Sequence, residues 1–443
     1  GNGAGTLTVT ADGGGYYTVR LPWDPVDAGW VGTMGLCDLQ FTVDGDGGGA
    51  EPAVTDTYAN NTDEMRVGDE GFYVNDPSTV NDVYCTVAGA NGNTGLSQAS
   101  PKDDIADILP LAGALTPNDM VFCDTGQWGP GTPHPEITIT TSEDGDATGN
   151  VYFIGSTNAS RTKFDMGATT TIDPFYLSGG DYITIDGFEI YNHGTTTSYV
   201  PVFATGSINS RILNCYFHNN DRSIYLAATS TSYQIRNCTI TSSTTPILVF
   251  DSSGGIVDHN VIYQNSGDGL YLANGDNSVI TFNTIYANSN FANVTLQDSG
   301  GNGSINCIVK NNILWATNPG HANIYVTTAS EAGLPANNFN YNDLYATGSA
   351  VIGFRGSANR TTLAGWQTVG GQPNEDGNSI SSDPLFVSVT AGGEDFHEQS
   401  RYGTYSGGLW TPLAQNSPCI DSADPAQPFA LEPANSGGRA NQG

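Results

Sequence analysis

Three ionic residues share one position of a repeated segment and could support acid–base chemistry on a sugar. Arg236 and Asp258 occupy this position in successive copies, and Lys310 occupies it two copies later. A uronate lyase needs Ca²⁺ or another cation to neutralise the sugar carboxylate, and a basic group to remove the C5 proton. If the protein is an enzyme, these three residues are the candidates. The alternative, which we favour, is a cross-strand ion pair of Arg236 and Asp258 worth about 0.2–1 kcal/mol.

Hydrolysis of a glycosidic bond would need a second carboxyl group near Asp258. The two carboxyl groups of a glycosidase lie about 5 Å apart in retaining enzymes and about 6.5–9.5 Å apart in inverting ones. Asp186 shares the column of Asp258 but lies three copies away, which is about 14 Å at the strand spacing of a sheet. The paired aspartates and the GHG and RxK motifs of polygalacturonases are absent from the sequence. These residues therefore favour a protein without catalysis.

A second column of the repeat is aromatic and could contact a glycan or a protein partner. Exposed flat rings stack on sugars or pack against a partner. The alternative is that a turn or a neighbouring loop covers the rings. The column contains Tyr191, Tyr263, Tyr286 and Trp315, with His218 and Thr241 between them.

The charge of the chain limits its partners. Thirteen basic residues against 45 acidic ones give a net charge of −32, which repels nucleic acids and anionic membranes. No run of eighteen apolar residues predicts a membrane span. Two acidic turns offer oxygen ligands at spacings that Ca²⁺ tolerates, although neither completes an EF-hand loop. Their carboxylates are Asp44, Asp46, Asp144 and Asp146.

Seven cysteines occur in a chain that otherwise looks secreted. Cys85 and Cys123 lie in two short apolar runs, VYCTV and VFCDT, that could be neighbouring strands. A disulfide between them would fit such an arrangement, and the sequence leaves this open.

A repeat of 22–29 residues must position all of these side chains. The segments ILNCYF, IRNCTI, VDHNVI, ITFNTI and VKNNIL follow one another, and a second apolar run follows each. Short β-rich runs at this period predict the coils of a solenoid, in which matching residues stack about 4.8 Å apart. Asparagine is unfavourable in strands, but a stacked amide can bond to its neighbours on either side. The expected internal ladder consists of Cys215, Cys238, Asn260, Asn283 and Asn312.

The repeat resembles the coils of right-handed parallel β-helix proteins of the pectate-lyase-like superfamily. The segment VYCTVAGANGNTGLSQASPKDDIADIL resembles the start of secreted bacterial members, in which a short helix caps the open end. SDPLFV, DFHEQS and NSPCIDSADP resemble their closing coils. The resemblance implies an all-β, extracellular protein, but no single function, because the group includes lyases, hydrolases, epimerases, adhesins and structural proteins.

The expected organisation has four parts. Residues 1–50 read as a partial immunoglobulin-like β unit or a set of donor strands, and 51–81 as a linker. Residues 82–345 form the β-helix, and 346–443 form irregular C-terminal coils and a cap. We also expect the chain to be a piece of a longer precursor.

Three functions fit these observations. The one we favour is an extracellular structural or adhesive protein that self-associates head to tail into a filament through open sheet edges. The second is a secreted polysaccharide lyase or glycoside hydrolase acting on an acidic glycan, and the third is a non-catalytic glycan-binding module. An enzyme should gather charged and aromatic groups on one surface, whereas a filament subunit should expose apolar surface at its ends.

Overall fold

The computed structural model describes residues 71–443, apart from 113–114, 130–135, 157, 169–170, 195–198, 333–336, 370–375, 407–408 and 429–438. Before residue 71 it describes two strand pairs. β1 (Thr8–Gly13) pairs antiparallel with β2 (Tyr16–Arg20), and β3 (Phe41–Val43) with β4 (Val54–Asp56). The chain divides into two compact units, 1–69 and 70–443.

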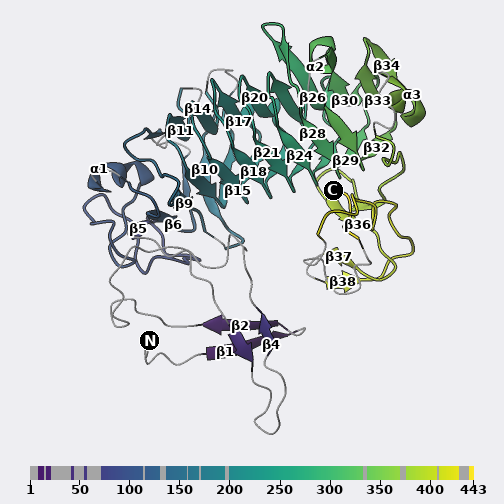
Figure 1. Cartoon of the computed structure of the whole chain (residues 1–443). Coiled ribbons are helices and arrows are strands. Elements are labelled where there is room, and N and C mark those ends of the chain that lie inside the picture. Colours follow the sequence, from purple (N-terminus) through teal and green to yellow (C-terminus); the bar gives the residue numbers. More distant parts are fainter. Residues whose placement is uncertain are drawn as a thin grey trace. The chain divides into compact units, whose positions relative to one another are not determined.

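The second unit is built from three long sheets that run side by side along the solenoid (Figure 1). The ten-stranded sheet contains β5 (Gly71–Val74), β6 (Met120–Cys123), β9 (Val151–Ile154), β12 (Ile183–Asp186), β15 (Arg211–Leu213), β18 (Gln234–Arg236), β21 (Ile256–Asp258), β24 (Val279–Thr281), β28 (Ile308–Lys310) and β31 (Asn338–Asn340). The nine-stranded sheet contains β7 (Gly126–Trp128), β10 (Thr162–Asp165), β13 (Phe188–Tyr191), β16 (Tyr216–His218), β19 (Thr239–Thr241), β22 (Val261–Tyr263), β25 (Thr284–Tyr286), β29 (Ile313–Ala316) and β32 (Asp343–Ala346).

The eleven-stranded sheet completes each coil. It contains β8 (Ile137–Ile139), β11 (Phe175–Ser178), β14 (Val202–Thr205), β17 (Arg222–Ala227), β20 (Thr245–Phe250), β23 (Leu270–Ala273), β26 (Ala292–Ser299), β30 (Ala322–Val326), β33 (Val351–Arg355), β34 (Ala358–Arg360) and β27 (Asn302–Gly303), which pairs with β26. Neighbouring strands of successive coils are parallel, as in a right-handed parallel β-helix. Two strands extend the coils beyond the expected range of 82–345, since β5 joins the ten-stranded sheet and β33 the eleven-stranded one.

The interior is a continuous apolar core supplied by alternate residues of the short strands. Ile212, Ile235 and Val257 stack in register on the ten-stranded sheet, and Phe217, Ile240 and Ile262 do so on the nine-stranded sheet. Their side chains are almost fully buried. Each buried aliphatic or aromatic side chain contributes about 1.5–3 kcal/mol, so the repeated stacks account for much of the fold's stability.

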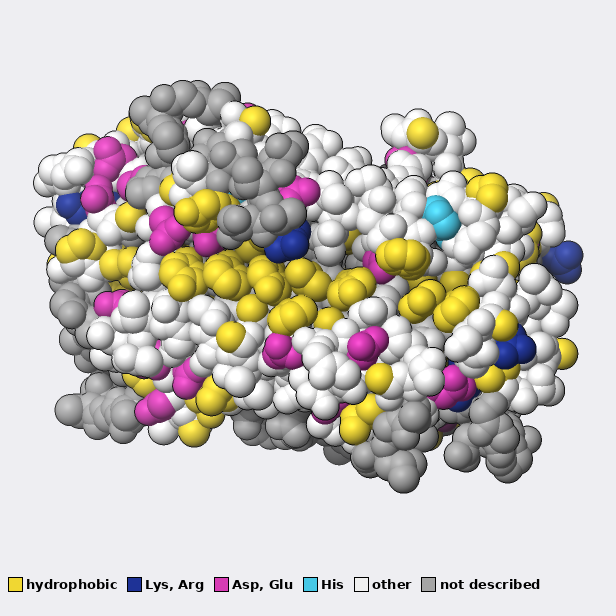
Figure 2. All heavy atoms as spheres, turned by 90° about the horizontal axis from the view of Figure 1, so that it is seen from above, with side chains coloured by type: hydrophobic (Ala, Val, Ile, Leu, Met, Phe, Trp, Pro, Cys, Tyr) yellow, Lys and Arg dark blue, Asp and Glu magenta, His cyan; other side chains and the backbone are white. Residues whose placement is uncertain are grey.

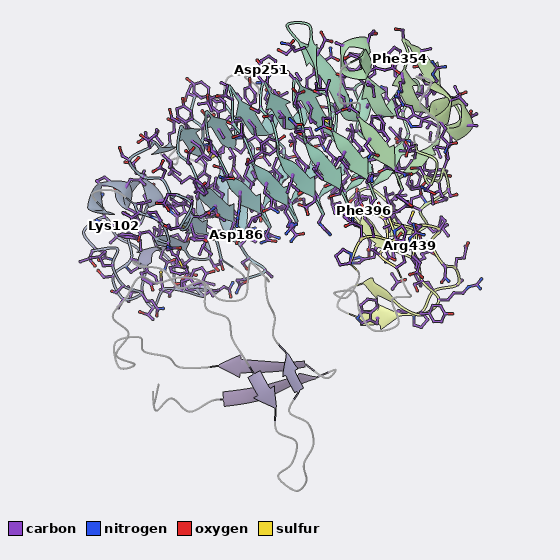
Figure 3. The ribbon with its side chains drawn as sticks, viewed as in Figure 1. Lys102, Asp186, Asp251, Phe354, Phe396 and Arg439 are labelled. Carbon is purple, nitrogen blue, oxygen red and sulfur yellow. The ribbon has the colours of Figure 1, made fainter. Side chains whose placement is uncertain are left out.

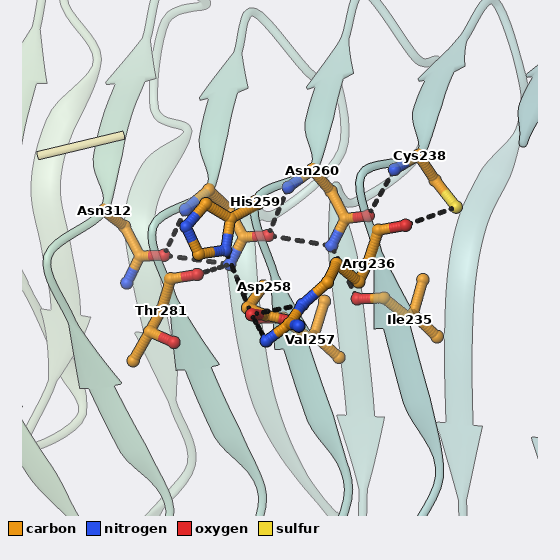
Figure 4. Close-up of polar contacts among 10 residues, drawn as sticks. Ile235, Arg236, Cys238, Val257, Asp258, His259, Asn260, Thr281 and Asn312 are labelled. Atoms are coloured by element: carbon orange, nitrogen blue, oxygen red, sulfur yellow. Dashed lines mark hydrogen bonds and ion pairs between the residues drawn. The ribbon is translucent and has the colours of Figure 1, made fainter. Parts of the chain in front are cut away.

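An amide ladder fills the turn between the ten- and nine-stranded sheets (Figure 4). The side-chain oxygen of Asn260 accepts the backbone N–H of Cys238 at 2.9 Å, and that of Asn283 accepts the N–H of Asn260 at 3.0 Å. Asn312 does the same for Asn283, and the ladder continues to Asn342. All four amides are buried, so each coil supplies the partner that its neighbour needs. A second ladder, through Asn265 and Asn288, lies in the turn that follows the strands of the nine-stranded sheet.

At each end of the solenoid, a segment of the chain pairs with a strand of the terminal coil. At the end of the last coil, β34 pairs antiparallel with β33, and Trp366 of α3 (Leu363–Gln367) is fully buried. The Trp366 indole donates to Asp376 at 2.6 Å, and the Arg355 guanidinium lies over its ring. At the first coil, η1 (Ile105–Asp107) and α1 (Leu109–Ala112) follow a segment in which Lys102 exchanges backbone hydrogen bonds with Tyr73 and Asn75 beside β5. A filament built by strand addition needs open edges, and these segments pair with β5 at one end and with β33 at the other.

The C-terminal segment, which we define as the chain after α3, packs on the outer face of the nine-stranded sheet. It contains the antiparallel pairs β35 (Phe386–Ser388) with β36 (Asp395–Glu398) and β37 (Thr404–Ser406) with β38 (Leu409–Thr411). Figure 3 labels Phe396 in this segment, beside the last coils. The remaining helix, α2 (Thr328–Ala332), follows β30. None of the helices among the described residues has the length and hydrophobicity needed to cross a membrane.

Candidate functional site

Arg236 and Asp258 form a bidentate ion pair on adjacent strands β18 and β21 (Figure 4). Arg236 Nη2 and Nε lie 2.6 and 2.9 Å from Asp258 Oδ2, and His259 Nδ1 lies 3.0 Å from the same oxygen. Burial opposes ionisation of Asp258, but the hydrogen bonds from His259 and Arg236 outweigh it and lower its pKa. The carboxylate is thus occupied by its neighbours, as in a structural ion pair.

Lys310 stands in the same column but does not join this group. It lies two strands further along the sheet, and its ammonium is 3.6 Å from Asp424 of the C-terminal segment. The structure therefore brings two of the three candidate catalytic residues together. His259 adds a third side chain to that pair through its contact with Asp258. It lies in the turn after β21, with a backbone φ of 56°.

The predicted aromatic column lies on the outer face of the nine-stranded sheet, and the C-terminal segment covers most of it. Phe396 lies 5.0 Å from the ring of Tyr263 and 5.6 Å from that of Tyr286, and Phe386 lies 6.2 Å from Trp315. Three of the four predicted rings thus contact the molecule's own C-terminal segment, although each remains partly exposed. Tyr191 stacks on His218 instead, with ring centroids 4.6 Å apart.

A polar group surrounds the uncovered end of that column. Glu189 bridges Lys163 and His218, each at 3.3 Å. Burial opposes ionisation of Glu189, but these two partners outweigh it and lower its pKa. Burial, together with the charges of Asp165 and Glu189, raises the pKa of Tyr191 to about 12. The carboxylate, ammonium and imidazole satisfy one another, which is the behaviour of a structural network.

The predicted calcium ligands are only partly described. Asp44 and Asp46 lie outside the described residues. Asp146 accepts the backbone N–H and the hydroxyl of Thr148, so it closes its own turn, and burial raises the pKa of Asp144. Among the residues that the structure describes, no group of three or more histidine, cysteine or acidic side chains is placed to hold a metal ion.

The disulfide between Cys85 and Cys123 is not formed, and both residues are buried free thiols. Cys85 lies in a loop rather than a strand because the Asp124 carboxylate accepts the N–H groups of Val83, Tyr84 and Cys85. The Cys85 thiol contacts the carbonyl of Val74, and the Cys123 thiol that of Val121. Cys215 and Cys238 of the ladder column are buried free thiols as well.

A longer aromatic column, which the sequence analysis missed, lies on the outer face of the eleven-stranded sheet. Figure 2 shows this face from above, with a stripe of hydrophobic side chains along it. The register of the strands places one outward residue of each coil in the stripe. These residues are Tyr176, Phe203, Tyr225, Leu248, Tyr271, Thr295, Tyr325 and Phe354, and all six aromatic rings are partly exposed. We call this column the aromatic stripe.

The rings of the aromatic stripe differ in how much of their faces is occupied. Tyr176, Phe203 and Tyr225 stack nearly parallel, with centroids 5.3 and 5.1 Å apart. Beyond them Leu248 and Thr295 alternate with Tyr271 and Tyr325, so these tyrosines recur every second coil, about 9.6 Å apart. The smaller neighbours leave ring surface of Tyr271 available to a ligand, whereas Tyr325 stacks on Phe354 with ring centroids 4.5 Å apart and lies 5.8 Å from Phe291.

Polar groups border the aromatic stripe. The Arg222 guanidinium lies 5.2 Å from the centroid of Tyr225. Asp268 accepts the N–H of Phe291 and the hydroxyl of Thr295, both at 2.7 Å. Burial raises the pKa of Tyr271, with further contributions from the charges of Asp268 and Asp298. Rings flanked by hydrogen-bonding groups are the usual composition of a sugar-binding surface.

Comparisons with known proteins support the fold. A family model described as "Right handed beta helix region" matches residues 168–314 and 202–365. No curated protein matches the chain. A solved rhamnogalacturonan lyase superposes with a TM-score of 0.50 at 14% identity, covering 72% of this chain and 91% of the lyase. Pectate lyase Pel9A superposes with a TM-score of 0.52 at 15% identity, covering 85% of this chain and 96% of the lyase. At these identities the likeness shows the fold alone.

Proposed function

We propose that this chain, which folds as a right-handed parallel β-helix, binds an extended polysaccharide along the aromatic stripe. The observation that carries this proposal is that six partly exposed rings line up along the solenoid on the eleven-stranded sheet, whereas three of the rings on the nine-stranded sheet contact Phe386 or Phe396 of the C-terminal segment. Rings spaced along the solenoid axis match a ligand that repeats along its own length. The wider superfamily leads us to place this binding outside the cell.

The charge of the protein favours a neutral polysaccharide. A net charge of −32 repels a polyanion, and Asp268 and Asp298 lie near Tyr271 within the stripe. Neutral sugars rely on ring stacking and hydrogen bonds, and the stripe supplies both. This choice differs from the acidic glycan that the sequence analysis named as a substrate.

The filament role has less support. It was expected to use open sheet edges, and β34, α3 and the 95–102 segment occupy edges at the two ends of the coils. An extracellular protein can still be adhesive by holding a polysaccharide, so a binding role retains that part of the structural hypothesis.

Affinity electrophoresis tests the proposal with gels that contain xylan, glucomannan, β-glucan, galactan or polygalacturonate. We expect one or more neutral polysaccharides to retard the protein. Tyr225→Ala and Tyr271→Ala should each weaken binding about 2- to 10-fold, the value of one aromatic contact. Tyr402→Ala is the matched control, because Tyr402 is 79% exposed in the C-terminal segment. Retardation that the stripe substitutions leave unchanged would sink the proposal.

A further inference from the structure

Two carboxyl groups meet at the first end of the aromatic stripe. Glu136 immediately precedes β8, and Asp173 lies two residues before β11, on the neighbouring coil. Glu136 Oε2 accepts the backbone N–H of Asp173 at 3.2 Å. That contact and ordinary bond lengths limit the two carboxyl carbons to a separation of about 8 Å or less. This upper limit is compatible with the carboxyl separations of glycosidases, about 5 Å in retaining enzymes and about 6.5–9.5 Å in inverting ones.

The surroundings of the two carboxyl groups differ. Both oxygens of Glu136 accept hydrogen bonds, from Asp173 N–H and from the hydroxyl of Thr138, as suits an acceptor-only carboxylate. Asp173 is 4% exposed and accepts the N–H of Val200 at 2.5 Å. Burial, with a contribution from the charge of Glu136, raises the pKa of Asp173 to about 7. Two neighbouring carboxyl groups in unequal environments are suited to separate acid and base roles.

An aromatic ring lies directly beside the pair. Tyr176 is the strand partner of Thr138, whose hydroxyl donates to Glu136. One side of the Tyr176 ring stacks on Phe203, and on the other side its strand neighbour is the small Thr138. A sugar stacked on this ring would lie next to the Glu136 carboxylate, at the end of the surface that is proposed to hold the polysaccharide.

A buried imidazole next to the pair lacks a complete set of partners. His193 is 2% exposed, and its Nε2 lies 2.9 Å from the carbonyl of Ile172, the residue before Asp173. Its Nδ1 has no hydrogen-bond partner among the described residues, and neither has the buried Oδ2 of Asp221. Unpartnered buried polar atoms in a natural protein call for an explanation, and a polar ligand at this place supplies one.

From these contacts we infer that Glu136 and Asp173 form a catalytic pair that hydrolyses a glycosidic bond of the polysaccharide bound along the aromatic stripe. Asp173 donates its proton to the glycosidic oxygen as the bond from that oxygen to C1 breaks, and the leaving sugar departs as an alcohol. Glu136 takes a proton from the water whose oxygen bonds to C1. One water is consumed, and proton exchange with solvent restores both carboxyl groups. This inference rests on the proposed function, because the stripe must first hold the chain.

The test measures new reducing ends and binding separately on the same polysaccharide panel. Wild-type protein should release reducing ends from a polysaccharide that it binds. Asp173→Asn and Glu136→Gln should lower the rate on the order of 100-fold or more while binding changes little. Asp383→Asn is the matched control, because Asp383 is an exposed carboxyl group of the C-terminal segment, away from the stripe and the pair, and it should keep the rate. Thermal unfolding of each variant checks its folding, and Glu136→Asp provides a second variant with the charge retained.

The pH profile separates a catalytic acid from a merely structural carboxyl group. The charge of Glu136 on the preceding coil acts on Asp173, while His193 contacts the carbonyl of the adjacent Ile172 and has the charge of Asp221 near it. The wild-type rate should fall as the pH rises through about 7, since Asp173 must carry a proton. Binding without reducing ends would overturn the catalytic inference alone. If the wild-type protein neither binds a polysaccharide nor releases reducing ends, the proposed function is overturned as well. Unsaturated products would show that the bond is broken by elimination rather than by hydrolysis, which would also contradict the inference.

Discussion

Replacing Asn283 with alanine should remove a large share of the stability of the central coils. The Asn283 amide donates to the carbonyl of Val257 at 2.8 Å and to Asn312 at 3.0 Å, and its oxygen accepts the N–H of Asn260 at 3.0 Å. The side chain is fully buried, so water cannot take its place. Asn283→Ala leaves at least the Asn260 N–H and the Val257 carbonyl without partners. At about 1–3 kcal/mol for each buried unsatisfied group, the expected loss is about 2–6 kcal/mol.

Urea unfolding followed by circular dichroism measures this loss as a shift in the midpoint at an unchanged slope. Asn378→Ala is the control, because Asn378 is exposed on a turn, and it should shift the free energy of unfolding by less than about 0.5 kcal/mol. Amide exchange should accelerate around residues 257–262 and 309–314, the strands on either side of Asn283. A loss below about 1 kcal/mol for Asn283→Ala would refute the ladder as a source of stability.

Three further predictions concern an ion pair, a buried carboxyl group and the helix at the last coil. Asp258→Asn should cost about 1–2 kcal/mol at pH 7, and because the folded pKa of Asp258 is lowered, the difference should shrink as the pH falls below about 4, measured by thermal unfolding. Burial raises the pKa of Asp343 to about 7, so the folded protein holds this proton at a pH where the unfolded chain has lost it. The free energy of unfolding of the wild type should therefore fall, relative to that of Asp343→Asn, as the pH rises from about 4 to about 7. Parallel curves for the two proteins would contradict this sign. Trp366→Ala should cost about 3–5 kcal/mol and expose the last coil, giving oligomers in size-exclusion chromatography with light scattering, whereas a stable monomeric variant would show that α3 is not a cap.

The period of the sequence explains why the coils and the ladder could be predicted. Every coil in the 212–314 region places apolar residues at the same two positions and a cysteine or asparagine at the same turn, and the pairing of β15, β18, β21, β24 and β28 follows that alignment. The first boundary was harder, because the insertion of residues 75–119 separates β5 from β6, whereas β33 follows β30 at a step of 29 residues, from Ala322 to Val351. A period that is interrupted by insertions no longer identifies which residues share a column.

The surfaces were predicted less well than the core. The aromatic stripe had a sequence signal, since Tyr225, Tyr271 and Tyr325 occupy matching places in the second apolar run of their coils. The cover on the other aromatic column had no such signal, because Phe386 and Phe396 come from a distant C-terminal segment. Glu136 and Asp173 are 37 residues apart, farther than the 22–29 residues of the repeat, so the periodicity could not place them side by side.

The most direct test of the binding proposal is a crystal structure of the protein with an oligosaccharide from the polysaccharide that retards it most in the gels. The proposal predicts sugar rings along the outer face of the eleven-stranded sheet, in contact with Tyr225, Tyr271 and Tyr325 and aligned with the solenoid axis. Sugar bound on the nine-stranded sheet or on the C-terminal segment, with the aromatic stripe empty, would contradict it.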